Sequence, residues 1–186
     1  DFVKAPSRPG RGFPVLARGH GRRTGIRKGR WTLGTLKKIT EIGVAVRDLE
    51  KVTEALVRCF GGEAGEVFEM PQFGMRFRMV RIADVDFELM EPTDENGMIA
   101  RFICTHGEGL HHVAFAVDRA VDRMADLKEK GCRMINDTPL DLLGGKVGFL
   151  HPGSFGGIMF ELIEYPGEYI PPGSGPLGPF LGKKGG

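Results

Sequence analysis

The pattern of apolar and polar residues predicts a strand at residues 39–46, followed by a helix at 49–60. Asp48 stands in the N-cap position of that helix, and Gly61 and Gly62 end it. Three strand-like stretches follow, at residues 66–70, 75–82 and 85–91. The first half of the chain therefore has the order strand, helix and three strands.

The same order then begins again. Residues 98–106 form a short predicted connecting helix, and the strand at 111–117 is followed by a helix at 120–131. Three further strands are predicted at residues 132–135, 146–150 and 157–165. The expected fold class is α+β, with two tandem βαβββ modules at about 39–92 and 110–166 that form a cleft.

The repeat is also visible in the residues themselves. EIGVAV at 41–46 aligns with HVAFAV at 112–117, and FELMEP at 87–92 aligns with FELIEYP at 160–166. These matches fall on the first and last strands of the modules. Two such modules are usually related by a pseudo-twofold axis, so matched positions should meet at one common site.

That relation pairs Glu41 with His112, and Glu88 with Glu161. A carboxylate within an apolar run is costly unless it is solvated, paired or bound to a metal. A solvated sheet face explains both glutamates equally well, and duplication alone can preserve a similarity without function. Strand alternation also requires one of His111 and His112 to face away from the site.

Composition divides the chain into a domain and two tails. Residues 1–38 are rich in Gly and Arg and carry 11 basic residues and one acid, whereas the remainder carries 15 basic and 23 acidic residues. We expect the 1–38 tail to be mobile or bound to an acidic partner, and 167–186 to form a second, Gly/Pro-rich tail. The folded domain is expected at 39–166.

Several classes of protein are not favoured by this composition. No apolar run approaches the length of a membrane span, and no secretory signal is visible. The three cysteines are unpatterned, which is typical of a cytoplasmic or organelle-matrix protein. Specific nucleic-acid binding is not predicted, because no folded binding motif accompanies the basic tail.

Taken together, these stretches resemble the vicinal oxygen chelate superfamily, which includes glyoxalases and dioxygenases, and within it the methylmalonyl-CoA epimerases. The resemblance covers about residues 38–166. It depends on four stretches: IGVAVRDLEK at 42–51, FELMEP at 87–92, GEGLHHVAFAVD at 107–118 and FLHPGSFGGIMFELIEYP at 149–166.

The resemblance implies a divalent metal held by residues of the first and last strands of the modules. His112 and Glu161 match ligands of the second module, and Glu88 matches a first-module position that is Gln or Glu in relatives. The fourth ligand is normally a histidine, and Glu41 stands in its place. Three ionised glutamates would more than neutralise a divalent ion, so the ion and its ligands together would carry a net negative charge. Glu41 could instead serve as a base, or the site could be metal-free and inactive.

The implied activity is metal-assisted proton transfer alpha to an acyl-CoA thioester. Glu161, with Glu88 or Glu41, would act as the acid and base. The ligand types suit Co, Mn, Ni, Fe or Zn. The alternatives are a non-catalytic subunit of a larger assembly and another enzyme of the superfamily, of the glyoxalase or dioxygenase type. A homodimer is compatible with either.

For other polar residues the sequence gives less evidence of a function. Arg76, Arg78 and Arg81 could meet CoA phosphates or a substrate carboxylate, but the pattern favours an exposed polar face. His151 could contact substrate or stabilise a turn.

Overall fold

The computed structural model describes residues 36–142 and 144–166. The first strand begins at Leu36, three residues earlier than the pattern suggests. The remainder of the 1–38 tail, and the whole 167–186 tail, lie outside the described residues. The main elements are β1 (Leu36–Ala45), α1 (Leu49–Phe60), β2 (Glu63–Met70), β3 (Met75–Ile82), β4 (Val85–Pro92), α2 (Met98–His106), β5 (Gly109–Val117), α3 (Ala120–Glu129), β6 (Leu140–Leu142), β7 (Gly145–Leu150) and β8 (Met159–Glu164).

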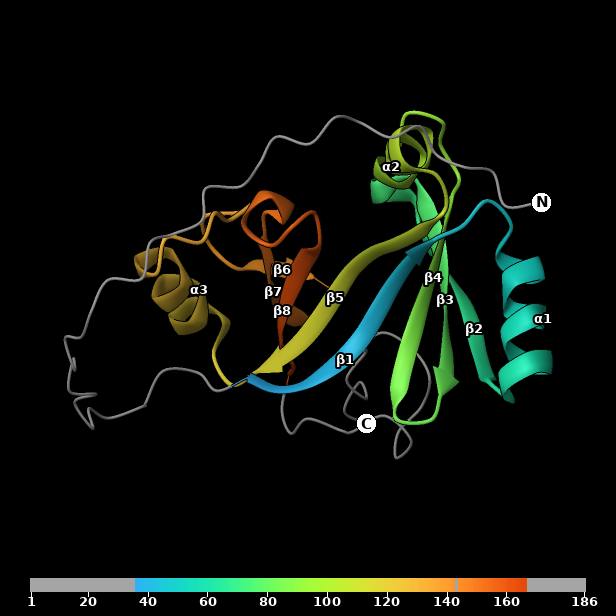
Figure 1. Cartoon of the computed structure of the whole chain (residues 1–186), viewed down its shortest axis with the longest axis horizontal. Coiled ribbons are helices and arrows are strands. Elements are labelled where there is room, and N and C mark those ends of the chain that lie inside the picture. Colours follow the sequence, from blue (N-terminus) through green and yellow to red (C-terminus); the bar gives the residue numbers. More distant parts are fainter. Residues whose placement is uncertain (1–35, 143, 167–186) are drawn as a thin grey trace, which may run out of the picture. The chain divides into compact units, whose positions relative to one another are not determined.

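The eight strands form one mixed sheet in the order β2-β3-β4-β1-β5-β8-β7-β6. In each module the first and last strands are parallel, β1 with β4 and β5 with β8, and the two first strands run antiparallel at the centre. Figure 1 shows the modules as two halves of a curved sheet joined along β1 and β5. The predicted α+β fold of paired βαβββ modules is confirmed.

Helix α1 begins and ends where the sequence predicts. The Asp48 carboxylate accepts a hydrogen bond of 2.9 Å from the backbone N–H of Lys51, which satisfies one otherwise unpaired donor of the first turn. Gly61 ends the helix in a left-handed conformation with φ of 67°, which a residue without a Cβ adopts at little cost. These two residues fix the length of α1.

Helices α1 and α3 cover the outer side of the sheet, one on each module (Figure 1). Leu49 of α1 packs with Val80 and Leu89, and Met124 of α3 packs with Leu162. Helix α2 and the inner side of the first module share a third, methionine-rich cluster: Ala45, Met70, Met75, Phe77, Met79, Met90, Ile99 and Ile103. Among the described residues, no helix is both long and apolar enough to cross a bilayer.

The prediction of a strand at residues 132–135 is wrong. This segment makes only one isolated bridge, from Met134 to Leu150, and the strand that follows α3 is β6. The Asn136 side chain replaces the sheet ladder here: its amide donates to the carbonyl of Val147, and its Oδ1 accepts from the N–H of Phe149. Backbone hydrogen bonds of 2.8 Å still join Ile135 to Phe149 and Arg133 to His151, and the Asn136 side chain ends this pairing after residue 135.

Candidate metal and proton-transfer site

All four predicted site residues lie on the inner side of the sheet, opposite the side that α1 and α3 cover. Side chains alternate along each strand, and Leu89 on β4 packs toward α1, so its neighbour Glu88 points inward. On β8, Leu162 packs toward α3, and its neighbour Glu161 points inward in the same way. The sheet therefore brings both glutamates to one face.

The strand register repeats the symmetry that the sequence suggests. In the first module Gly43 lies beside Glu88, and in the second module the matching Ala114 lies beside Glu161. Across the central strand pair, Gly43 also faces His112, and Ala114 faces Glu41. The four side chains thus come from four adjacent strands and converge near the centre of the sheet.

His112 lies between the carboxylates. Its Nε2 is 3.1 Å from Oε2 of Glu161 and 3.4 Å from Oε2 of Glu88. Ligand atoms of Glu41, Glu88 and His112 all lie within 4.8 Å of one another. Glu41, His112 and Glu161 are buried, with exposed fractions of 7%, 4% and 7%. Glu88 is half-buried, with 13% of its side chain exposed, so neither it nor Glu161 lies on a solvated sheet face.

Burial and mutual repulsion shift the proton affinities of this cluster. Burial, and then the charges of Glu88 and Glu161, raises the pKa of Glu41 well above its ordinary value. Burial and the charge of Glu161 raise the pKa of Glu88 to about 7, against the lowering effect of His112. Burial alone would lower the pKa of His112, but close contact with Glu161 and the charges of all three carboxylates raise it to about 9.

The cluster fits a divalent cation. His112 Nε2 is buried and, despite its two close carboxylates, makes no well-formed hydrogen bond within the described part of the chain. A buried polar atom without a hydrogen bond is costly, and coordination of a metal would satisfy it. One imidazole and several carboxylates form a ligand set that suits transition metals, and the cation would replace the protons that now balance their charge.

Two residues that the sequence did not indicate also shape the site. A Cβ built on Gly43 would lie 2.2 Å from Cε1 of His112, so only glycine leaves room for this ring. The matched residue in the second module is Ala114, and this difference between the repeats was the available signal. The Tyr165 hydroxyl donates to Oε1 of Glu41 at 3.3 Å, a contact between residues 124 positions apart that no local pattern indicates.

His111 does not face away from the site, contrary to the expectation from strand alternation. Gly43 pairs with His112 but the next residue, Val44, pairs with Leu110, so His111 is the extra residue of a bulge. Bulges re-aim side chains and are common near active sites. As a result, Nδ1 of His111 lies 3.0 Å from Nδ1 of His112. Burial, followed by the charges of His112 and His106, lowers the pKa of His111 to about 4.

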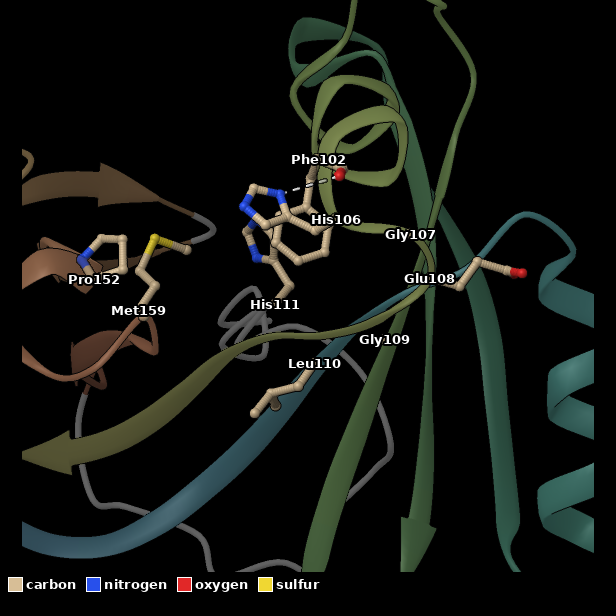
Figure 2. A pocket seen from close by; sticks show the side chains of 10 residues that line it. Phe102, His106, Gly107, Glu108, Gly109, Leu110, His111, Pro152 and Met159 are labelled. Carbon is tan, nitrogen blue, oxygen red and sulfur yellow. Dashed lines mark hydrogen bonds between the residues drawn. The ribbon is translucent and has the colours of Figure 1, made fainter. Parts of the chain in front are cut away.

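A pocket of about 290 Å³ borders the site through His111. Figure 2 shows the rings of Phe102, His106 and His111 on one side of this pocket, and Met159 and Pro152 across from them. The pocket lies between α2 and the start of β8.

The remaining polar residues singled out in the sequence have structural partners. The three arginines of β3 pair with carboxylates, each within 2.8 Å: Arg76 with Glu91, Arg78 with Glu50 and Arg81 with Asp86. His151 accepts a hydrogen bond from the N–H of Gly153 at 3.0 Å, which supports its turn-stabilising interpretation. None of these contacts adds a residue to the site.

Comparison with known proteins identifies the family. Residues 40–149 match the model of the Glyoxalase/Bleomycin resistance protein/Dioxygenase superfamily. The chain belongs to this superfamily. Within it, the chain is 34% identical to the mitochondrial methylmalonyl-CoA epimerase of Bos taurus over 72% of this chain and 76% of that protein.

Two further relatives are also methylmalonyl-CoA epimerases. The ethylmalonyl-CoA/methylmalonyl-CoA epimerase of Cereibacter sphaeroides is 28% identical over 68% of this chain and 97% of its own length. Among solved structures, a Streptomyces coelicolor methylmalonyl-CoA epimerase in complex with 2-nitronate-propionyl-CoA superimposes with a TM-score of 0.65 and 31% identity. That match covers 70% of this chain and 98% of the other.

Proposed function

We propose that this chain is a methylmalonyl-CoA epimerase-type isomerase that moves the proton alpha to an acyl-CoA thioester. The observation that carries the proposal is the convergence of Glu41, Glu88, His112 and Glu161 from four adjacent strands. The relatives support the substrate class, since one solved relative is described in complex with methylmalonyl-CoA and NH4+.

We assign the metal to His112, Glu88, Glu161 and Glu41. When bound, a divalent cation supplies Lewis-acid stabilisation of negative charge that develops on the substrate oxygens. His112 contributes its buried Nε2, which lies 3.4 Å from Oε2 of Glu88 and 3.1 Å from Oε2 of Glu161. The carboxylate and imidazole ligands suit Co, Mn, Ni, Fe or Zn.

The proton transfer needs one ionised and one protonated group. An ionised carboxylate takes the Cα proton, the electron pair moves into the thioester carbonyl, and a protonated acid returns a proton to the opposite face of the carbon. Burial raises the pKa of Glu41 and Glu88 in the metal-free site, so whichever of them does not bind the cation can hold a proton near neutral pH. We assign these roles to Glu161 with Glu88 or Glu41, which the strand pairing brings together on one face of the sheet.

Glu41 occupies the position at which the superfamily resemblance implies a histidine. Its carboxylate lies within the same 4.8 Å group as Glu88 and His112, so it reaches the site and does not turn away from it. Tyr165 holds one of its oxygens. Both contacts support a role for Glu41 as ligand or base, and they argue against a residue that has lost its function in the site.

The test is exchange of the substrate alpha proton. Purified full chain, loaded in turn with each candidate metal, is incubated with methylmalonyl-CoA in deuterated water, and deuterium incorporation is followed by mass spectrometry. We expect metal-dependent incorporation at the alpha carbon and its loss in His112→Ala and Glu161→Ala. Cys104→Ala, an exposed residue of α2, serves as a matched control and should exchange normally.

Absence of exchange above the buffer rate with every metal would overturn the enzyme assignment and favour the non-catalytic subunit. Bound metal with activity on a different substrate would indicate a glyoxalase-type or dioxygenase-type member instead. We further propose a location in the cytoplasm or an organelle matrix, a homodimer, and an acidic partner for the basic tail. Relatives named as mitochondrial and relatives from bacteria are consistent with either location.

A further inference from the structure

The bulge in β5 places a second imidazole directly behind the proposed metal ligand. At this bulge Gly43 of β1 pairs with His112 and Val44 pairs with Leu110, so His111 has no partner of its own on β1. An unbulged strand would send these side chains to opposite faces. Here the two Nδ1 atoms are 3.0 Å apart, which is the distance of an N–H···N hydrogen bond.

The ring of His111 is held in place from its other side. Its ring meets the ring of Phe102 edge-on, with centroids 4.8 Å apart and planes at 74° (Figure 2). Phe102 in turn stacks on His106 at 4.7 Å, and both residues belong to α2. The position of His111 is therefore fixed by helix packing as well as by its contact with His112.

The direction of the hydrogen bond follows from the chemistry of a ligating imidazole. A neutral histidine that offers Nε2 to a metal carries its proton on Nδ1. In His112 that proton points at Nδ1 of His111, which must then act as the acceptor and keep its own proton on Nε2. The imidazolium form of His112 makes the same hydrogen bond, since it also carries a proton on Nδ1.

We propose that His111 is a positioning residue that accepts the Nδ1–H of His112 and so holds Nε2 of His112 toward Glu88 and Glu161. This inference depends on the metal site proposed above. Partners of this kind fix both the tautomer and the orientation of the ring, and they make the ligating nitrogen more basic. Gly43 leaves the space that the fixed ring occupies.

The test compares His111→Phe, which keeps a flat ring without an acceptor, with His111→Asn, whose Oδ1 can take the place of Nδ1. His106→Phe is the matched control, because His106 lines the same pocket and its ring stacks on Phe102. The affinity of each full-length protein for Co²⁺ is measured by calorimetry. We expect His111→Phe to weaken binding by about 10- to 100-fold, and His111→Asn to restore most of it. His106→Phe should bind as the wild type does.

A second measurement does not depend on metal. In metal-free, ¹⁵N-labelled protein, NMR should detect coupling between the two Nδ1 nitrogens across the hydrogen bond, and this coupling should vanish in His111→Phe but persist in His106→Phe. Absence of the coupling in the wild type overturns the inference. Equal Co²⁺ affinities for wild type and His111→Phe also overturn it, and leave the metal site standing. A wild type that shows the coupling but binds none of the candidate metals overturns the proposed metal site instead, and with it the role of His111 toward a ligand.

Discussion

Replacement of Glu88 by glutamine should stabilise the metal-free protein at alkaline pH. Burial and the charge of Glu161 raise the pKa of Glu88 from 4.5 to about 7, so ionised Glu88 is disfavoured in the folded state. Because the folded-state pKa is raised, the cost is absent below the unfolded value near 4.5, grows as the pH rises, and is complete above about 7. Glutamine cannot ionise, and it keeps the size and an oxygen ligand of the side chain.

The magnitude follows from the size of the shift. A difference of about 2.5 pKa units corresponds to about 3 kcal/mol, which is the upper limit for Glu88→Gln at alkaline pH. Loss of the Glu88 charge also weakens the Coulombic support of protonated His112, and this subtracts from the gain. We therefore expect an increase in unfolding free energy of about 1–3 kcal/mol near pH 8.5, and of less than about 1 kcal/mol near pH 5.

The assay is urea unfolding of chelator-treated protein at both pH values, followed by circular dichroism. Glu66→Gln, at an exposed position on β2, is the control and should change the free energy of unfolding by no more than about 0.5 kcal/mol at either pH. If Glu88→Gln shows no greater stability near pH 8.5 than near pH 5, relative to wild type, then Glu88 does not carry the buried charge that the geometry implies.

Three further predictions concern the site and its scaffold. Glu41→His should increase Co²⁺ affinity on the order of tenfold if Glu41 is a ligand, because imidazole suits this ion; weaker binding by calorimetry would indicate that the carboxylate itself is required. Gly43→Ala should reduce Co²⁺ affinity, since its Cβ would lie 2.2 Å from the His112 ring, and unchanged affinity would show that the ring moves freely. Asp48→Ala should lower the free energy of unfolding by about 1 kcal/mol through loss of the N-cap, and a denaturant titration with no change would remove that role.

The sequence alone determined the elements and their equivalence. Apolar periodicity, Asp48 and Gly61 define α1, and the internal match of the modules relates Glu41 to His112. Such signals are local or repeated, so they can be read without knowing which strands pair. The prediction of a strand at 132–135 was wrong because the side chain of Asn136 hydrogen-bonds to the backbone of Val147 and Phe149 in place of regular strand pairing. These partners lie about a dozen residues further along the chain, so no local pattern indicates them.

Only the tertiary structure decided how the site is assembled. The antiparallel pairing of β1 with β5 joins the modules, and its bulge brings His111 beside His112. A bulge depends on the register of the opposite strand, and the space at Gly43 depends on the ring across from it, so neither can be seen along a single stretch of chain. The burial that shifts the carboxylate pKa values is also a property of the assembled sheet.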